Sequence, residues 1–560
     1  MAPLASTSAF AITWQIVVNN STVPPTSAPQ TNTPKFFSYN QPAVNNAGQV
    51  VFRARAKPAT GGGSAGEPVR GVYTRLVTST TAPVQIVADN LGVQVPSPNT
   101  TGATFIEFPS TPRSDATSYL VATRGQSQPV ITLSDGTKLG TSGVYARAFQ
   151  TTASGYQGIP SLPVIGLSTA ASLVGSVPQY SYFQVPGEAP GTRFDQFPGS
   201  PSPVGLAVNR SYVVAFKGNY TVGTTSKTGV YYRNILGTTP SAVQLVVKSG
   251  DPIPGFTDKV FGSAAPPSAA KSGNVMKVVF AGFDNEENPT AGGIYITPLS
   301  PRAITPIVSI GGTVPGVTPE EKFNKFGEGL SYDGRYVSFW GAWGDQLQEI
   351  KKYCPKDGNK DLLDYCNNVN GINTSDPPDG TDAGGAYYLL SVPKNQGIFV
   401  ADTFSNTVSL VQRTEPTNSS SDAFKNFIYW TYSGKPPGGE EAEDAEPPRW
   451  RASAFTAVKS DAAAFKGLKG EYDISLGAVD GLYVKRFSSS SLITALDTTM
   501  TGQSVDPNAP AGSLVSAIGV ERDGFRGNWL SITASMLNAA TTASWAGIYV
   551  HNCGSGCGTW

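Results

Sequence analysis

Oxygen-bearing side chains in one short segment could coordinate a hard cation. Acidic and amide side chains stand at alternate positions from residue 357, as in the first half of a calcium loop, which gathers about six to eight oxygens. The pattern then departs from an EF-hand, because Leu362 stands where that loop needs Gly and Asn368 where it needs a bidentate Glu. A calcium site and a solvated surface loop held by a disulfide both stay open, and no other cofactor is expected. The predicted calcium ligands are Asp357, Asn359, Asp361 and Asp364.

The single histidine of the chain, His551, restricts the catalytic mechanisms that are available. A Ser-His-Asp or Cys-His site would have to use it, and a site with several histidine ligands is excluded. His551 directly follows a Gly-Ile-Tyr segment, so we expect it at a strand end. Chemistry without histidine leaves paired carboxylates that hydrolyse glycosides, or Tyr with Arg or Lys in eliminations. The sequence assigns no residue to such a reaction.

Four tryptophans could bind a sugar. They lie in the two repeat units that also carry insertions, and flat aromatic faces beside polar groups suit sugar rings through stacking and hydrogen bonds. The alternative is that the indoles fill gaps between packed sheets. The predicted ligand-binding residues are Trp340, Trp343, Trp430 and Trp450.

The four cysteines form two local pairs, Cys354 with Cys366 and Cys553 with Cys557. Local pairs favour two small disulfides and therefore an oxidising compartment: the extracellular space, a periplasm or an organelle lumen. A four-thiolate zinc site is the less favoured alternative, because neither pair has the usual C-x2-C spacing. The N-terminal residues lack the basic start and apolar run of a secretory signal, so we expect the signal to be absent from this chain.

Composition excludes two kinds of partner. Lys plus Arg is 40 and Asp plus Glu is 40, so the formal net charge is zero, which argues against nucleic acid. No stretch approaches the ~20 apolar residues of a membrane span. A carbohydrate or a protein partner remains, and we expect a monomer unless the chain belongs to a larger assembly.

The elements that would position these residues form a repeat. Gly, then Val, Ile or Leu, then Tyr or Phe recurs along the chain, after an apolar run and, further upstream, a Phe-rich segment. A Val-, Ile- or Leu-rich run follows most copies, and such runs are typical of strands. Four antiparallel strands repeated around an axis define a propeller blade. The copies begin at Gly71, Gly143, Gly229, Gly293, Gly397, Gly481 and Gly547.

The last repeat lacks its outer strand, and the opposite end of the chain carries it. Residues 13–25 have the pattern of an outer strand followed by a Pro turn. Closing the ring this way removes an exposed sheet edge and holds the N-terminus. A β-solenoid would show a stricter period, and two β-sandwiches would not explain the missing strand. We therefore predict an all-β fold, a seven-bladed β-propeller of four-stranded antiparallel blades in which residues 12–20 complete blade 7.

The repeat implies one domain over residues 1–560 with two insertions. The first, 344–396 in unit five, contains the first cysteine pair, and the second, 431–450 in unit six, contains a run of carboxylates. A hydrated loop is the favoured interpretation of such a run. The approximate blades are 36–90, 105–166, 193–250, 259–312, 322–414, 423–498 and 512–550.

The repeat unit resembles the TolB-like propeller repeat, in which an apolar strand follows a polar-Asp-Gly turn. Residues 331–339 and 45–52 show that turn and strand most plainly. The unit is closer still to a functionally uncharacterised group of exported microbial propellers with N-x-x-G-x-V-x-F … G-[IV]-Y units. The resemblance spans all seven units, and it implies a fold without transferring any catalytic residue.

Function is predicted mainly from what the sequence lacks, because no catalytic or cofactor motif stands out. The favoured prediction is an exported binding or structural module, with a carbohydrate or protein partner at one mouth of the channel. The alternative is a polysaccharide lyase or glycoside hydrolase that uses Tyr, Arg and carboxylates at the axial face. A third option is a subunit that docks through both insertions. Convergence of such groups at one mouth, with perturbed pKa values, would favour the enzyme.

Overall fold

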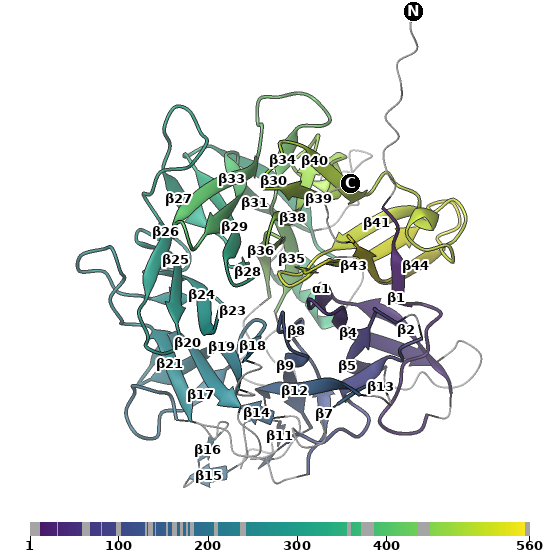
Figure 1. The fold of residues 1–560 in the computed structure, drawn as a ribbon, viewed down its shortest axis with the longest axis horizontal. Helices are drawn as coiled ribbons and strands as arrows, with labels where there is room; N and C mark the ends of the chain where they lie inside the picture. Colours follow the sequence, from purple (N-terminus) through teal and green to yellow (C-terminus); the bar gives the residue numbers. More distant parts are fainter. Residues whose placement is uncertain are drawn as a thin grey trace, which may run out of the picture.

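The Gly-Val-Tyr segments form the third strand of seven four-stranded antiparallel sheets. In this computed structural model the sheets stand around one axis (Figure 1), so the predicted seven-bladed propeller is confirmed. The structure describes residues 12–30, 32–58, 68–79, 81–96, 102–128, 131–132, 138–140, 142–152, 155–158, 165–167, 172–174, 177–179, 184–206, 211–235, 242–355, 360–370, 386–434 and 448–554.

The first four blades follow one another along the chain. Blade 1 comprises β2 (Pro34–Tyr39), β4 (Gln49–Pro58), β5 (Val69–Leu76) and β6 (Gln85–Asp89). Blade 2 comprises β7 (Phe105–Glu107), β9 (Leu120–Ser127), β12 (Ser142–Thr152) and β14 (Ile165–Leu167). Blade 3 comprises β17 (Phe194–Gln196), β19 (Ser211–Val222), β20 (Thr225–Ile235) and β21 (Val243–Lys248). Blade 4 comprises β22 (Ser263–Ala264), β24 (Val275–Phe283), β25 (Gly292–Pro298) and β26 (Thr305–Ser309).

The last three blades include the closing one. Blade 5 comprises β27 (Phe323–Phe326), β29 (Tyr336–Trp343), β32 (Gln396–Asp402) and β33 (Thr407–Arg413). Blade 6 comprises β34 (Phe424–Asn426), β38 (Ala462–Lys469), β39 (Val479–Arg486) and β40 (Leu492–Asp497). Blade 7 comprises β41 (Leu514–Gly519), β43 (Trp529–Leu537), β44 (Ser544–Asn552) and, from the N-terminus, β1 (Gln15–Asn19).

The ring closes as the sequence predicted. Strand β1 pairs antiparallel with β44, with Gln15 opposite Val550 and Val18 opposite Ile548. The Nδ1 atom of His551 lies 2.9 Å from the carbonyl oxygen of Thr13, so the single histidine is part of this closure. Pairing the two ends of the chain gives blade 7 its fourth strand and covers the edge that β44 would otherwise expose.

One aromatic pair explains why a Phe-rich segment and a Gly-Val-Tyr segment recur together in the repeat. In six blades a Phe near the start of the first strand meets the aromatic residue of the Gly-Val-Tyr segment edge to face, with ring centroids 4.7–5.3 Å apart. This is the preferred geometry of aromatic rings. Glycine in the second strand makes room for the Phe, because a Cβ at Gly218 would lie 2.6 Å from the Phe194 ring. The pairs are Phe36–Tyr73, Phe105–Tyr145, Phe194–Tyr231, Phe261–Tyr295, Phe323–Phe399 and Phe424–Tyr483.

Hydrophobic core fills the spaces between neighbouring blades. Val51 and Val72 of blade 1, for example, belong to one buried cluster with Phe105 and Val121 of blade 2. Each blade therefore buries apolar side chains on both of its faces, as expected for propeller sheets that stack around an axis.

The inner edge of each blade carries an additional short strand that pairs with the second strand. These seven segments contact one another in order and form a closed inner ring around the axis. Residues from opposite sides of the propeller therefore meet at its centre. The segments are β3 (Ala43–Val44), β8 (Arg113–Ser114), β18 (Ser202–Leu206), β23 (Ser268–Ser272), β28 (Ser331–Tyr332), β37 (Thr456–Lys459) and β42 (Phe525–Arg526).

Strand order defines two faces of the ring. All turns from second to third strands lie on one face, called here the insertion face, and all turns from inner to second strands lie on the other, called the turn face. The insertion in blade 5 contains β30 (Leu347–Tyr353), α1 (Lys360–Tyr365), a π-helical turn (Cys366–Asn370) and β31 (Tyr387–Pro393). The insertion in blade 6 is the hairpin of β35 (Tyr429–Ser433) and β36 (Arg449–Ser453), which interrupts the inner strand between β34 and β37.

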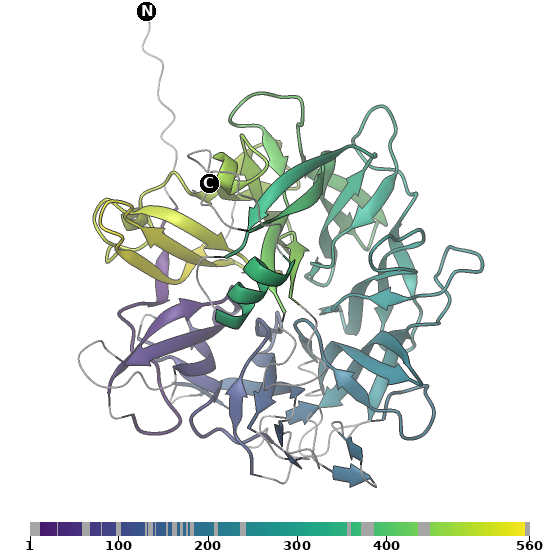
Figure 2. The same cartoon turned by 180° about the vertical axis from the view of Figure 1, so that it is seen from behind.

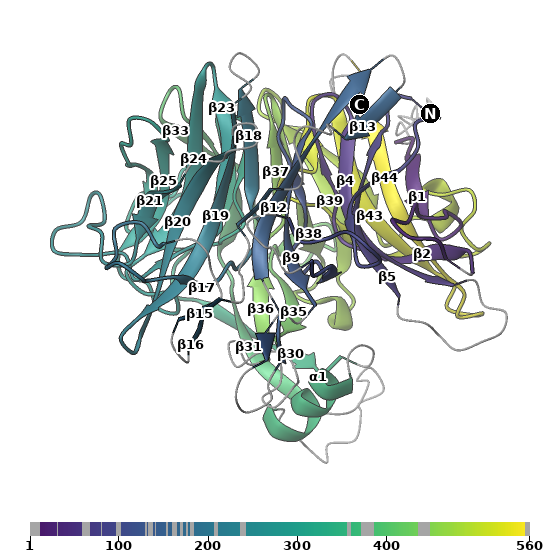
Figure 3. The same cartoon turned by 90° about the horizontal axis from the view of Figure 1, so that it is seen from below.

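Both insertions project from the insertion face (Figure 3), and α1 lies over the middle of that face (Figure 2). Smaller additions surround blade 2: β10 (Ile131–Thr132) pairs with β11 (Lys138–Leu139), β13 (Gly155–Gly158) with β12, and β15 (Ser172–Val174) with β16 (Val177–Gln179). No helix in the described part of the chain has the length and apolar character needed to cross a bilayer.

Candidate binding site

A buried ion network closes the axis of the propeller. Arg113 of blade 2 donates from Nε and Nη2 to both carboxylate oxygens of Asp523 in blade 7, at 2.5 and 2.9 Å. Arg526 donates from Nη2 to the same carboxylate at 2.7 Å. Both guanidiniums also donate to other blades: Arg113 to the Pro267 carbonyl in blade 4, and Arg526 to the Tyr332 carbonyl in blade 5. Arg526 also donates to the Val458 carbonyl in blade 6, so the network joins five blades across the axis.

Convergence of carboxylates, Tyr and Arg at the axis would favour an enzyme, and this network is where such groups meet. Arg113, Asp523 and Arg526 do converge, but their side chains are 0%, 5% and 4% exposed. Burial raises the pKa of Asp523, while the two guanidiniums lower it by more, so its pKa lies below the ordinary value. A carboxylate whose pKa is lowered, and which is fully paired and enclosed, has neither the proton near neutral pH nor the access that glycoside hydrolysis requires. The axial network therefore holds blades together.

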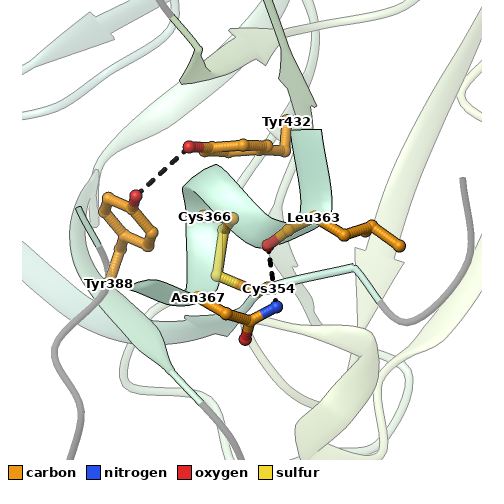
Figure 4. Close-up of a disulfide and its surroundings, with 6 residues drawn as sticks. All are labelled: Cys354, Leu363, Cys366, Asn367, Tyr388 and Tyr432. Carbon is orange, nitrogen blue, oxygen red and sulfur yellow. Dashed lines mark hydrogen bonds between the residues drawn. A yellow bond between two sulfur atoms is a disulfide. The ribbon is translucent and has the colours of Figure 1, made fainter. Parts of the chain in front are cut away.

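The two insertions meet in one small structure, called here the cap: β30, α1, the π-helical turn, β31, β35 and β36. Cys354 after β30 and Cys366 after α1 form the predicted disulfide. Both cysteines are buried in a cluster with Ala386 of blade 5 and Tyr432 of blade 6. Figure 4 shows the disulfide beside Tyr388 and Tyr432. Residues more than 60 positions apart in the sequence thus share one core.

Aromatic side chains fill the contact between the two insertions. Tyr388 lies with its ring 5.8 Å from that of Tyr432 and 6.4 Å from that of Trp450, and Tyr432 lies 5.4 Å from Trp450. The hydroxyls of Tyr388 and Tyr432 are 3.3 Å apart (Figure 4). Burial, and secondarily the Tyr388 hydroxyl, raises the pKa of Tyr432, so it stays neutral and available for hydrogen bonding.

Polar contacts tie the cap to the ring. At the base of β35 the Tyr429 hydroxyl donates to Oδ1 of Asp480 at 2.6 Å, and the ammonium of Lys466 lies 3.0 Å from Oδ2. On β30, Lys352 donates to Asp473 of blade 6 at 2.7 Å. All of these groups belong to elements near the insertion face, so the cap has a fixed seat on blade 6.

The four tryptophans that were predicted to bind a ligand fall into two pairs. Trp340 and Trp343 of β29 are 3% and 4% exposed. The indole of Trp340 donates to Oε1 of Gln396 at 3.0 Å, so it is a satisfied core residue and neither ring offers a face to a ligand. Trp430 and Trp450 lie in the hairpin of the cap and are half-buried. The structure does not bring the four rings into one patch.

The second pair has indole donors without an acceptor among the described residues. Tyr432 is the cross-strand neighbour of Trp450, and Trp430 precedes Tyr432 by two positions, so all three side chains share one face of the hairpin. The indole nitrogens of Trp430 and Trp450 are buried, and neither has an acceptor among the residues that the structure describes. A buried donor without an acceptor costs about 1–3 kcal/mol. Such a group in a folded protein calls for an explanation.

The predicted calcium ligands and the second cysteine pair lie partly outside the described residues. Asp357 and Asn359 lie outside them; Asp361 and Asp364 are exposed and one turn apart on α1. Within the described ranges no three or more His, Cys, Asp or Glu side chains gather as a metal site, and calcium stays a prediction. Cys553 is disulfide-bonded, and its predicted partner, Cys557, is outside the described residues.

A cavity of about 270 Å³ lies on the opposite, turn face, between blades 4, 5 and 6. None of its residues is among the candidates predicted from the sequence. The available signal was Phe404, a large apolar residue inside the otherwise polar turn between β32 and β33, where folding does not require one. The lining residues are Lys271, Ser272, Gly273, Asp333, Gly334, Arg335, Tyr336, Phe404 and Ser460.

Comparisons with known proteins do not assign this chain to a family. No family model matches this sequence, and no curated protein matches it either; the TolB-like resemblance therefore stays a prediction. Among solved structures the chain is similar to a β-fructofuranosidase from Bombyx mori, at 9% identity over 95% of each chain with a TM-score of 0.24. A β-fructofuranosidase mutant from Microbacterium saccharophilum K-1 gives 9% identity over 60% of this chain and 73% of the other, with a TM-score of 0.24. Scores this low support no functional argument, and the chain stands as a seven-bladed β-propeller.

Proposed function

We propose that this protein is a non-enzymatic binding module of an oxidising compartment, and that it recognises a carbohydrate through the cap on its insertion face. The observation that carries the proposal is the pair of indole donors in the cap, Trp430 and Trp450, which lack acceptors among the described residues. Both indole nitrogens are buried, so the proposal includes a small opening of the hairpin, after which sugar hydroxyl and carboxylate oxygens would satisfy these donors.

The construction of the cap supports a binding role. Two insertions from different blades contribute to it, and a disulfide with a shared aromatic core stabilises their contact. Neither feature is needed by the repeat, because blades 1 and 4 close without comparable insertions. Tyrosines and tryptophans on a rigid scaffold combine apolar contact with hydrogen bonding, which suits sugar rings.

The arrangement at the axis supports binding over catalysis. The carboxylate and guanidiniums that meet there are enclosed and paired with one another, so they stabilise the ring. The disulfides of Cys354 and Cys553 support the proposed oxidising compartment.

A panel of immobilised neutral and acidic polysaccharides tests the proposal with two measurements on the same samples. We expect retention of the protein on at least one polysaccharide, without release of reducing or unsaturated ends. Trp430→Phe and Trp450→Phe remove the N–H donors and should each weaken retention about fivefold, the effect of roughly 1 kcal/mol. Trp545→Phe is the matched control, because its indole already donates to Oδ2 of Asp506 at 2.8 Å in blade 7. Product release, or equal retention of all four proteins, would overturn the proposal.

A further inference from the structure

The turn-face cavity lies on the side of the ring opposite the cap and is built from three blades. Lys271 comes from the end of β23 in blade 4, Asp333 and Arg335 from the inner turn of blade 5, Phe404 from the outer turn of blade 5, and Ser460 from blade 6. The proposal that follows is independent of the cap.

Phe404 gives this cavity an exposed aromatic face. Its side chain is 60% exposed, although a phenyl ring in water gains nothing for folding. The guanidinium of Arg335 lies 5.2 Å from the centroid of Phe404 and 4.8 Å from that of Tyr336. Arg335 therefore braces the ring beside the cavity in a cation–π contact.

Hydrogen bonds hold the aromatic face in place. Arg335 donates from Nη2 and Nε to the carboxylate of Asp402, at 2.6 and 3.0 Å. The same carboxylate accepts the backbone N–H of Phe404 at 2.9 Å, so one acidic group fixes both the cation and the turn. These hydrogen bonds, that from Arg335 first, lower the pKa of Asp402 to about 2, and it is ionised at any ordinary pH.

The inner turn of blade 5 is equally fixed. Oδ1 of Asp333 accepts the backbone N–H groups of Arg335 and Tyr336 at 2.9 and 2.7 Å. Gly334 has a φ of 107°, and a Cβ there would lie 2.2 Å from the carbonyl oxygen of Lys271. Glycine thus lets blades 4 and 5 approach closely at the cavity, and the walls are formed before any ligand arrives.

Three polar atoms along the cavity have no hydrogen-bond partner within the described part of the chain: the ammonium nitrogen of Lys271, Oδ2 of Asp333 and the hydroxyl of Ser460. They offer donors and an acceptor to a ligand. The charges of Lys271 and Arg335 balance those of Asp333 and Asp402, so the site has no excess of either sign. It therefore favours a neutral ligand with many hydroxyls.

We propose that this cavity binds a single neutral sugar ring, stacked on Phe404 and hydrogen-bonded to Asp333, Lys271 and Ser460. Its volume of about 270 Å³ lies just below the roughly 300–1,000 Å³ of pockets for drug-sized ligands. One ring fits such a space, whereas an extended chain does not. The protein thereby has a second carbohydrate site that faces away from the cap.

Saturation-transfer NMR on the full chain tests the proposal with free glucose, galactose and mannose as neutral probes, and glucuronic acid and glucosamine as charged ones. We expect transfer to at least one neutral hexose, about fivefold weaker binding in Phe404→Ala and Phe404→Leu, and retained binding in Phe404→Tyr, which keeps the flat ring. The control is Leu476→Ala, because Leu476 is 57% exposed but lies in a turn on the insertion face.

Several results would overturn the proposal: no transfer to any neutral hexose, tighter binding of either charged sugar, or unchanged binding in Phe404→Ala. The cap is tested separately in the same samples. Trp450→Phe should leave hexose binding unchanged, and Phe404→Ala should leave polysaccharide retention unchanged. If the wild-type protein binds only a hexose, the proposal for the cap has failed. If it binds only a polysaccharide, the proposal for the turn-face cavity has failed.

Discussion

The axis of the ring and the cap on its insertion face both bury polar groups, but the hydrogen bonding of those groups differs. At the axis each guanidinium donates to a carboxylate and to backbone carbonyls of other blades. In the cap two buried indole N–H groups have no acceptor among the described residues. Complete pairing indicates a structural role, because an unpaired buried charge would be very costly. Incomplete pairing calls for an explanation. The buried hydroxyls of Tyr73 and Tyr295 also lack a partner among the described residues, but they lie in different blades, whereas the two indoles share one face of the cap hairpin.

Removing the charge of Asp523 tests the structural side of this comparison and has the largest expected effect. Asp523→Asn keeps the shape of the side chain but removes the carboxylate charge with which both buried guanidiniums, Arg113 and Arg526, pair. We expect the free energy of unfolding to fall by about 3–5 kcal/mol, measured by denaturant titration. Glu349→Gln, at an exposed position of β30, should change it by less than about 0.5 kcal/mol. A stable Asp523→Asn variant would show that the network does not hold the blades together.

Removing the disulfide of the cap should lower the local stability of the cap and leave that of the ring unchanged. Cys354 and Cys366 are 12 positions apart, and a loop of about 15 residues contributes about 3 kcal/mol in the chain-entropy model. In the Cys354→Ser, Cys366→Ser double variant we expect faster hydrogen exchange over β30, β31, β35 and β36. Exchange in β24 and β25 of blade 4 should stay as in the wild type. Faster exchange throughout the ring would contradict the view that the cap is an addition to it.

Removing a hydrogen bond at the base of the cap should have a smaller effect on stability. Tyr429→Phe removes the hydroxyl that donates to Asp480 at 2.6 Å, and hydrogen bonds to charged groups contribute about 1.5–3 kcal/mol. The ammonium of Lys466 still pairs with Asp480, so we expect a loss near the lower end of that range. Thermal unfolding followed by circular dichroism measures it. An unchanged midpoint would mean that the hairpin does not depend on this seat.

The smallest expected effect is on the pH dependence of stability, through His551 at the closure of the ring. Burial lowers the pKa of His551, and the contact with Thr13 offsets this in part. The folded state therefore binds fewer protons than the unfolded chain, and stability should decline as pH falls through about 6.5 toward the lowered value. The decline contributed by Asp523, whose pKa is also lowered, begins only below about pH 4. His551→Asn should flatten the stability profile between about pH 7 and pH 5; an unaltered profile would contradict this assignment.

The repeat made the ring predictable from the sequence. In six of the seven blades the Gly-Val-Tyr copy has its Phe partner within the same blade, so the packing that defines such a blade lies within one repeat unit. The missing outer strand of blade 7 and the strand-like segment near Trp14 then predicted the closure. The local pair Cys354 and Cys366 was predictable for the same reason.

The sites were less predictable because they depend on contacts between blades. Arg113 and Asp523 are 410 positions apart, and nothing in either local sequence indicates that they meet. Trp340 and Trp450 look alike in the sequence, yet one indole is paired with Gln396 in the core and the other is unpaired in the cap. The cavity at Phe404 requires Lys271 and Ser460 from neighbouring blades, so only the folded ring defines it.

The central claim is that unpaired indoles in the cap serve ligand binding, and a matched pair of variants tests it most directly. Trp545→Phe removes a satisfied N–H, whereas Trp450→Phe removes an unsatisfied one. Unfolding free energy and polysaccharide retention are measured for both. We predict that Trp545→Phe loses about 1.5–3 kcal/mol with retention unchanged, and that Trp450→Phe keeps its stability and loses retention. Equal losses of stability with unchanged retention in both variants would contradict the claim.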